Sequence, residues 1–332
     1  MKVDDAANIF VGSDRSQLLA VKVLEHSIRR HTTMDVRLRS MHNLDLPDPK
    51  DVRQGKRTGF SFARFAIPQL MGYQGKAVYL DADMLVFRDF RELYSIPFEG
   101  AKIVIQEELP DQAQPSDKTG APKKRIKQCS VMLLDCAALD WDPLKIIGGL
   151  DGKYTYEHLL FDLCVLEEFQ IKYGVPFQWN SLEVYEPGKT GLLHYTDMHT
   201  QPWVHADNAN GYLWHEEVRL MLDDGSLTWK ELEAEIKLGN FRPSLLAEIR
   251  EAGAGPVKPI TSEQVMRYDK IDKDAGFVKH QAVYAAKKAR QAVIKAYEAQ
   301  LAKEAGPGAA VTYSALSQIR SVIAPITRRL FS

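Results

Sequence analysis

Two aspartates with one residue between them, Asp81 and Asp83, interrupt an otherwise apolar stretch at positions 76–87, which reads KAVYLDADMLVF. Residues two apart on a strand point to the same side, so the two carboxylates are expected to project together where the strand leaves its sheet. Carboxylates held so close repel one another and are costly to bury unless a cation neutralises them. Mg²⁺ and Mn²⁺ prefer such oxygen ligands and commonly bridge to substrate phosphates. The pair therefore indicates a metal site for a diphosphate, and a solvated turn after the strand is the alternative.

A second candidate ligand is His194, in the segment 192–203 that reads LLHYTDMHTQPW. A histidine after an apolar pair is more often packed in the core or exposed than bound to a metal. Here a polar loop follows the histidine and ends in Pro202 and Trp203, which form a rigid apolar anchor. Such a loop could hold the imidazole over a metal ion with one ring nitrogen exposed.

The elements that would position these groups alternate between apolar runs and helical patterns, which indicates an α/β fold. A strand at 8–12 is followed by the turn and cap residues Ser13 and Asp14 and then by a helix at 18–31. Ligands in open α/β sheets bind at the carboxyl ends of strands, so the place of the aspartates after a strand favours a functional role. Other strands are expected at 36–41, 101–106, 130–134 and near 175, helices at 61–70 and 156–169, and loops at 43–59 and 107–128.

After position 212 helical patterns take over. Thr228 and Glu231 form a capping box, the Gly- and Pro-rich stretch 253–259 marks a boundary, and a long helix is expected at 279–303. The predicted organisation is a catalytic domain at 1–215, helical elements packed on it at 216–255, and a helical C-terminal extension at 256–332.

The last segment, 305–332, has no acidic residue and mixes large apolar residues with Arg320, Arg328 and Arg329. One interpretation is a basic amphipathic surface that lies on an anionic membrane. The other is a helix that packs on the catalytic domain, with Pro325 interrupting its pattern.

The overall composition excludes several classes of protein. The chain has 43 Lys and Arg against 44 Asp and Glu, and a formal net charge of -1 gives no case for a general nucleic-acid binder. Its start resembles no signal peptide, and no window approaches the ~20 apolar residues of a spanning helix. The three cysteines, Cys129, Cys136 and Cys164, lie in apolar runs and are expected to be buried and reduced. We therefore expect a cytoplasmic protein, attached peripherally to the inner face of the membrane if the tail binds lipid.

Taken in order, these motifs resemble glycosyltransferase family 8, which includes glycogenin, galactinol synthases and bacterial lipopolysaccharide galactosyl- and glucosyltransferases. The resemblance covers 8–203: a strand and helix opened by a polar turn, an Arg-bearing helix, the YLDAD strand, and a late histidine followed by Pro-Trp. It implies a GT-A (Rossmann-like) fold, a nucleotide-sugar donor that is usually a UDP-sugar, a Mn²⁺ (or Mg²⁺) ion, and retention of the anomeric configuration.

The resemblance also implies roles for individual residues. Asp81, Asp83 and His194 match the metal ligands of the family. For the donor, Gly12, Ser13 and Asp14 match the turn that lines the base, Arg64 matches the arginine that reaches the donor, and Ala82 matches the residue along the ribose. Gln128 matches a position on the catalytic side where the family usually has Asn. Asn180 matches a residue on the side of the sugar or the acceptor.

The sequence departs from the family in its last motif, which usually reads His-x-x-Gly-x-x-Lys-Pro-Trp. The spacing from His194 to Pro202 is one residue longer, and Gln201 stands where the phosphate-binding Lys should be. Lys189 and Arg57 are candidates to replace that charge. The carboxylate near the reacting carbon is either Glu157, which we prefer because it lies where a loop enters a helix, or Asp162.

The function that the resemblance implies is a retaining, metal-dependent transfer of a hexose from a UDP-sugar to a glycan, a lipid-linked glycan or a protein. A non-catalytic nucleotide-sugar-binding module would keep the same metal residues. A phosphatase of the haloacid dehalogenase type also uses DxD after a strand, but it requires Thr or Val where this chain has Leu85. A nucleotidylyltransferase would need a Gly-rich phosphate loop, which VGSDRS at 11–16 does not provide.

Overall fold

The structure is a computed structural model that describes residues 6–106, 127–253 and 255–304. The tail 305–332 and most of the predicted loop, 107–126, lie outside the described residues.

Among the described residues, the central element is a six-stranded sheet with the order β2-β1-β3-β6-β5-β7. All of these strands are parallel except β6, which runs antiparallel to both of its neighbours. Their bounds are β1 Ala7–Gly12, β2 Val36–Ser40, β3 Lys76–Asp81, β5 Ile103–Gln106, β6 Val131–Asp135 and β7 Ile171–Val175. The predicted α/β class is thus confirmed.

Strand β3 lies inside the sheet and is buried on both faces. Ala77 and Tyr79 pack into the apolar cluster on one face, whereas Val78 and Leu80 pack into the cluster on the other. This explains why β3 reads as a continuous apolar run, and its last residue, Asp81, lies where that run reaches the carboxyl edge of the sheet.

The stretch 76–87 does not form one strand, because its two aspartates mark a change of sheet. β3 ends at Asp81, and β4 begins at Met84 in a separate three-stranded sheet with the order β4-β9-β8. In the antiparallel pairing of β4 with β9, Met84 lies opposite His194. This register brings a histidine 113 positions beyond Asp81 next to the aspartates. The small sheet consists of β4 Met84–Val86, β8 Ser181–Leu182 and β9 Leu192–His194.

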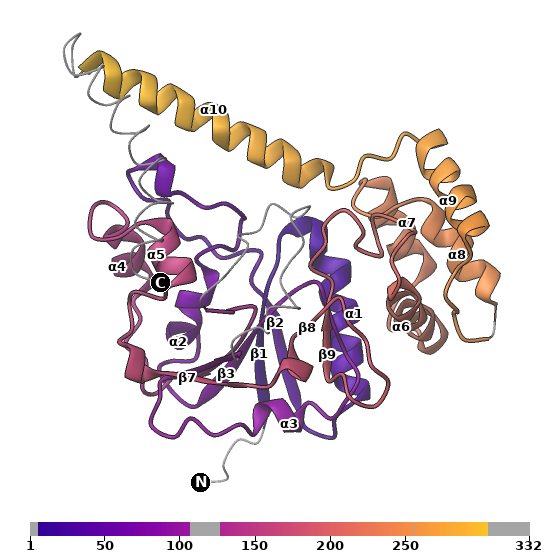
Figure 1. The fold of residues 1–332 in the computed structure, drawn as a ribbon, viewed down its shortest axis with the longest axis horizontal. Coiled ribbons are helices and arrows are strands. Elements are labelled where there is room, and N and C mark those ends of the chain that lie inside the picture. The colour runs from indigo at the N-terminus through magenta and orange to yellow at the C-terminus, as the bar shows by residue number, and fades with distance from the viewer. Residues whose placement is uncertain (1–5, 107–126, 254, 305–332) are drawn as a thin grey trace, which may run out of the picture.

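Helices cover both faces of the main sheet (Figure 1). Residues of α1 Leu18–Arg30 and α3 Arg91–Tyr94 join one apolar cluster. The opposite cluster takes residues of α2 Ile67–Leu70, α4 Pro143–Gly149 and α5 Tyr156–Phe161. Short 3-10 helices lie at η1 Arg15–Gln17, η2 Val52–Gln54, η3 Ala63–Ala66, η6 Glu168–Gln170 and η7 Phe177–Trp179.

Two predicted helices are shorter than expected. The segment 61–70 forms η3 and the four-residue α2. The helix predicted at 156–169 ends at Phe161, since Leu163 has a φ of 50°, a left-handed conformation that ends a helix.

The cysteines agree with the prediction in part. Cys129 and Cys136 are buried and free as predicted, but Cys164 is exposed, so that part of the prediction is wrong.

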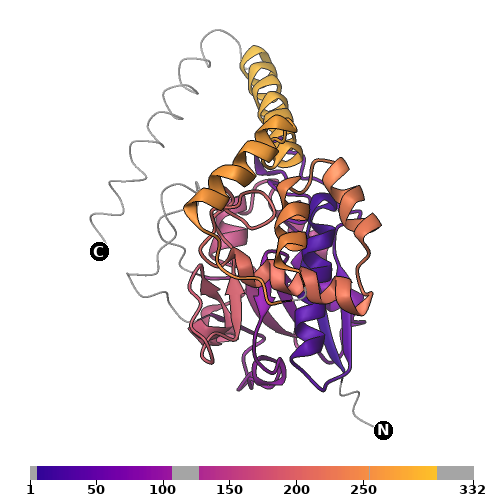
Figure 2. The same ribbon diagram turned by 90° about the vertical axis from the view of Figure 1, so that its right-hand side faces the viewer.

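The helices after β9 gather over α1 (Figure 2). They are α6 Gly211–Asp224, α7 Trp229–Lys237, α8 Ser244–Ala252 and α9 Ser262–Asp274. A third apolar cluster joins Leu19 of α1 and Leu193 of β9 to Trp203, Trp214 and Phe241. The capping box of Thr228 and Glu231 is present at α7. The predicted boundary at 215/216 falls inside α6, which packs on α1.

The last described helix, α10 Gln281–Glu304, crosses the molecule on the side opposite the N-terminus (Figure 1). None of its residues is buried. Just before it, His280 Nε2 lies 2.7 Å from the Met198 carbonyl oxygen, and further along, Arg290 Nη2 donates to the Arg53 carbonyl at 2.9 Å. The helix therefore links the loop after β9 to the loop that precedes η3. In the part of the chain that is described, no helix is long and apolar enough to cross a membrane.

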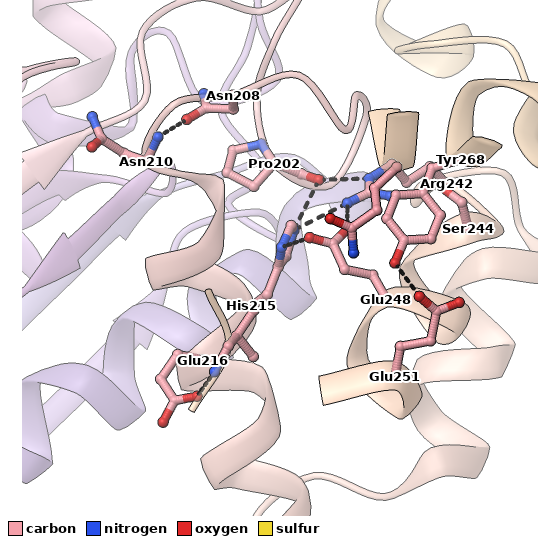
Figure 3. Close-up of polar contacts among 12 residues, drawn as sticks. Pro202, Asn208, Asn210, His215, Glu216, Arg242, Ser244, Glu248, Glu251 and Tyr268 are labelled. Atoms are coloured by element: carbon pink, nitrogen blue, oxygen red, sulfur yellow. Dashed lines mark hydrogen bonds and ion pairs between the residues drawn. The ribbon is translucent and has the colours of Figure 1, made fainter. Parts of the chain in front are cut away.

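A buried ionic cluster holds α6 and α8 together (Figure 3). Arg242 is fully buried and ion-paired with Glu248, which is 4% exposed. His215 Nδ1 lies 2.7 Å from Glu248 Oε1. Burial alone would raise the pKa of Glu248, but His215 and Arg242 outweigh it and lower that pKa to about 2.

We expect this cluster to make the protein sensitive to acid. A carboxyl whose pKa is lowered on folding stabilises the folded protein at pH values above its pKa in the unfolded chain, which is 4.5. This stabilisation is lost as the pH falls towards about 2, the pKa in the folded protein. The shift corresponds to about 3 kcal/mol. Urea unfolding of the wild type between pH 6 and 2 should show this loss, and Glu248→Gln, less stable at neutral pH, should lack it. Glu263→Gln, at an exposed position, is the control. An identical pH dependence of stability in wild type and Glu248→Gln would contradict the assignment of this acid sensitivity to Glu248.

Candidate active site

The structure brings the three predicted metal ligands together. One ligand atom from each of Asp81, Asp83 and His194 lies within 4.8 Å of the other two. His194 Nε2 is 3.1 Å from Asp83 Oδ1, and the imidazole is buried while both carboxylates are partly exposed. Carboxylate oxygens and a neutral imidazole nitrogen form a donor set that suits Mn²⁺ or Mg²⁺.

The orientation of the His194 ring is fixed from behind. Its Nδ1 lies 2.9 Å from Asn180 Oδ1, and the Asn180 amide nitrogen donates to Gln106 at the end of β5. Since the Asn180 oxygen can only accept, the ring proton belongs on Nδ1, and the Nε2 lone pair faces Asp83. The structure thus places Asn180, 1% exposed, behind a predicted metal ligand, whereas a sugar contact was expected on the open side.

Gln201 also contacts the candidate metal group. Its amide nitrogen donates to Asp83 Oδ2 and to the Tyr195 carbonyl, both at 2.9 Å, and the residue is 2% exposed. Both hydrogens of the amide are therefore in use within the protein. The expectation that Gln201 takes the place of a phosphate-binding lysine is not supported by this geometry, which makes it a support for Asp83.

The electrostatic surroundings of His194 favour a cation. Burial lowers the pKa of His194, but neighbouring Asp83, followed by Asp81 and Glu183, raises it overall. A group of carboxylates that attracts a proton to an adjacent imidazole also attracts a metal ion, which competes with that proton.

The predicted base-lining turn lies directly against the metal group. A Cβ on Gly12 would meet Tyr79 Oη at 2.1 Å and the Phe60 ring at 2.8 Å, so only glycine fits there. Tyr79 in turn donates from Oη to Asp81 Oδ1 at 2.8 Å. Asp14 Oδ1 accepts from the Gly59 amide at 3.0 Å, which closes the turn against the loop before η3. The other two predicted residues, Ser13 and Ala82, are buried.

A cleft with a volume of about 590 Å³ opens beside Asp81. Its walls include two buried cations, Arg64 and Lys127. Arg64 Nη1 donates to the Cys129 carbonyl at 2.9 Å, and its guanidinium lies 4.4 Å from the centre of the Tyr79 ring. Lys127 Nζ donates to the Asp162 carbonyl and pairs with Glu168 at 2.7 Å. Thr58, Phe60, Ser61, Tyr156 and Phe161 complete much of the lining.

The three predicted catalytic residues are placed differently from one another. Glu157 is exposed and ion-paired with Arg57, whose guanidinium stacks 4.1 Å from the ring centre of Tyr156 at the cleft wall. Asp162 caps the end of α5, next to the lysine of the cleft. Gln128 is buried, and its amide nitrogen has no hydrogen-bond partner among the described residues.

The two cations suggested as replacements for the missing lysine both have acidic partners. Lys189 pairs with Glu186 at 2.7 Å on an exposed turn, and Arg57 pairs with Glu157. Lys127, which sequence reasoning missed, lines the cleft, although it too has an acidic partner, Glu168. It stands at the end of the long polar stretch 107–128, and nothing in its own sequence context distinguished it from the other lysines there.

Two further polar residues were missed. Tyr79 precedes Asp81 by two positions on β3, a spacing that could have suggested their contact. Glu183, with a left-handed φ of 58°, accepts from the Asp197 amide at 2.7 Å and so holds the loop that follows His194. Burial is the main cause of the raised pKa of Glu183.

Comparison with known proteins gives the family. A family model described as "Glycosyl transferase family 8" matches residues 8–138. Protein CDI from Arabidopsis thaliana is 30% identical over 230 residues, which make up 63% of this chain and 85% of that protein. The chain belongs to glycosyltransferase family 8. The predicted membership is thereby confirmed, and with it a general role in glycosyl transfer.

Three solved structures with similarity to this family 8 chain are distant in sequence. They include the WbbM bifunctional glycosyltransferase, with a TM-score of 0.48 and 16% identity over 70% of this chain and 52% of that one. GlyE of Streptococcus pneumoniae TIGR4 has a TM-score of 0.47 and 16% identity over 73% and 66% of the two chains. The galactosyltransferase LgtC, in complex with donor and acceptor sugar analogs, has a TM-score of 0.46 and 16% identity over 69% of this chain and 99% of that one. This chain thus spans about half of WbbM. The mixed main sheet and the helices after β9 confirm the predicted α/β class with a helical C-terminal part, and the GT-A type is what membership of family 8 implies.

Proposed function

We propose that the protein transfers a hexose from a UDP-sugar to an acceptor, with retention of configuration, and that Asp81, Asp83 and His194 hold the Mn²⁺ or Mg²⁺ ion that this requires. The observation that carries the proposal is the convergence of these three ligands at the carboxyl end of β3, beside a cleft with two buried cations, in a member of family 8.

The chemistry requires stabilisation of negative charge on the departing diphosphate. A bound divalent ion supplies a Lewis acid for that charge. Arg64 adds positive charge along the cleft, and so does Lys127, which also pairs with Glu168. Tyr79 orients Asp81, and Gln201 orients Asp83. Gly12, Ser13 and Asp14 provide the turn for the nucleotide base.

Retention can arise by attack on the face from which the diphosphate departs or through a covalent intermediate on a carboxylate. Glu157 and Asp162 remain the candidates for that carboxylate, with Gln128 as a neutral neighbour of the sugar.

A non-catalytic nucleotide-sugar-binding module is the second candidate. The observation in its favour is that Gln201, which replaces the phosphate-binding lysine of the family motif, is fully engaged with Asp83 and Tyr195. Such a module would bind nucleotide and metal but would not turn over the donor.

Turnover distinguishes these candidates. We expect slow hydrolysis of UDP-sugars in the presence of Mn²⁺ and faster consumption with an acceptor, because water can replace a missing acceptor once the charge of the leaving group is stabilised. Proton NMR of the released sugar should show the α configuration first. A β product would contradict retention, and binding without any turnover across a panel of UDP-sugars would favour the module.

The acceptor is proposed to be a glycan, a lipid-linked glycan or a protein, and the predicted cytoplasmic location remains a prediction. For a membrane-borne acceptor, the basic segment 305–332 would provide peripheral attachment, since each arginine near anionic lipid contributes about 1 kcal/mol. We expect truncation after Gly306 to abolish co-sedimentation with anionic liposomes at an unchanged melting temperature. Early melting, without liposome binding by the full chain, would assign the segment to packing instead.

A further inference from the structure

Arg242, which lies in the connection between α7 and α8, is tied through the chain to the candidate metal group. We infer that Arg242 is a positioning residue for the metal site: it fixes the backbone directly after Gln201 and thereby holds the Gln201 amide on Asp83. This inference rests on the proposed function, because it assumes that Asp83 binds a metal ion.

The first link is the contact between Gln201 and Asp83. The amide nitrogen donates to Asp83 Oδ2, while Asp83 Oδ1 lies toward His194. One oxygen of the carboxylate is thus held by the protein and the other is directed to the ligand group. Partners that orient a metal ligand in this way typically change metal affinity 10–100-fold when they are removed.

The second link joins Arg242 to the two residues that follow Gln201. Its backbone amide donates to the Trp203 carbonyl at 2.8 Å, and its guanidinium Nε donates to the Pro202 carbonyl at 2.9 Å (Figure 3). Two successive carbonyls are therefore fixed by one residue. With Pro202 also restricted in φ, the direction in which the Gln201 side chain leaves the backbone is closely defined.

The third link explains why Arg242 itself cannot move. Its guanidinium pairs with Glu248 of α8 and donates to Ser244 Oγ at 2.6 Å. Ser244 is in turn held by Asp272 of α9, which accepts from its amide and its hydroxyl, both at 2.7 Å. Acidic groups on two helices thus fix the guanidinium in one orientation.

Docking of the C-terminal helices does not by itself require this arrangement. The Trp203 side chain already packs against Trp214 and Phe241, with ring centroids 5.4 and 6.4 Å away. The hydrogen bond from Arg242 Nε adds control over a main-chain carbonyl next to Gln201. This is the contribution that a positioning role predicts and a purely structural role does not.

The test compares Mn²⁺ affinity, measured in the presence of UDP by the EPR signal of free Mn²⁺. The main variant is Arg242→Met combined with Glu248→Leu, which removes both buried charges together and avoids leaving one unpaired. Ile249→Ala, a cavity in the same helix α8, is the control for lost stability. We expect about tenfold weaker Mn²⁺ binding in the double variant and wild-type affinity in Ile249→Ala.

A double-mutant cycle shows whether the effect passes through Gln201. Gln201→Ala alone should weaken Mn²⁺ binding by about tenfold, and adding the Arg242 and Glu248 changes to it should cause no further loss. Additive losses would overturn the inference, as would wild-type affinity in the double variant.

If the double variant does not fold, Arg242→Lys decides in its place. It keeps the charge opposite Glu248 but lacks the planar fork that reaches Pro202 and Glu248 together, so a severalfold loss that disappears in the Gln201→Ala background is expected. Failure of the wild type to bind Mn²⁺ with UDP would overturn the proposed function and the inference with it. Normal wild-type binding that no Arg242 variant alters would overturn the inference alone.

Discussion

Asp83→Asn is expected to abolish Mn²⁺-dependent binding of UDP and to lower the rate of sugar transfer by about a thousandfold. The expected severity follows from the Gln201 contact. Gln201 donates to Asp83 Oδ2, so an asparagine will turn its oxygen toward Gln201 and present its NH₂ group to His194 and the ion. An NH₂ group carries no negative charge and does not bind a metal, although the side chain keeps its size.

Calorimetric titration of UDP with and without Mn²⁺, together with kcat, measures this effect. Asp140→Asn is a matched control, because its carboxylate is 91% exposed and makes only a 3.7 Å contact with Lys102. Wild-type nucleotide affinity in Asp83→Asn at equal Mn²⁺ would show that the ion is held elsewhere. An unchanged circular dichroism spectrum is required in both variants.

Arg64→Met should cause the second largest loss, a decrease in kcat/KM of about a hundredfold. Methionine fills a similar volume but leaves the cleft beside Asp81 without one of its two buried cations. Burial would lower the pKa of Arg64, but Tyr79 and Asp81 raise it overall, so the side chain stays charged in its buried position. Its loss also removes the contact at 3.2 Å with Tyr79 Oη, and Tyr79 orients Asp81.

Two companion variants separate these effects. Tyr79→Phe keeps the charge of Arg64 and removes the hydrogen bonds of Tyr79 Oη with Asp81 and Arg64, so it should lose much less activity than Arg64→Met. Arg64→Lys keeps a charge but cannot donate in a fork to Cys129 and Tyr79, and we expect only partial recovery. Arg250→Met, on the exposed side of α8, is the control for loss of an arginine. Wild-type kcat/KM in Arg64→Met would remove this residue from the active site.

The local pattern around the aspartates predicted much of the site. An apolar run that ends in Asp-x-Asp is buried because β3 lies inside a sheet covered on both faces, and the carboxyl end of such a strand is where polar groups can face a ligand. Gly12 and the turn after β1 were predicted only through the resemblance, and they lie near Asp81 because β1 and β3 are adjacent parallel strands whose ends meet.

Long-range contacts could not be predicted in the same way. The sequence suggested His194 from its place before a polar loop and from the resemblance, but its position beside Asp83 depends on the pairing of β4 with β9 across more than a hundred residues. The contacts of Asn180 with His194 and of Gln201 with Asp83 were not predicted, because a polar side chain in a loop has the same local pattern whether it contacts a ligand or supports a neighbouring residue.

The sequence by itself therefore determined the fold class, the family of this protein and the pair of aspartates proposed to bind metal, because these depend on local periodicity and on short motifs. Only the tertiary structure decided which polar residues face the cleft and which support it. Lys127 became a cleft residue, and Arg242 became a support of the Gln201 segment, through contacts with elements 35 to 40 positions away. The physical reason is that a hydrogen bond depends on the distance and direction between two groups, and the packing of sheets and helices sets both.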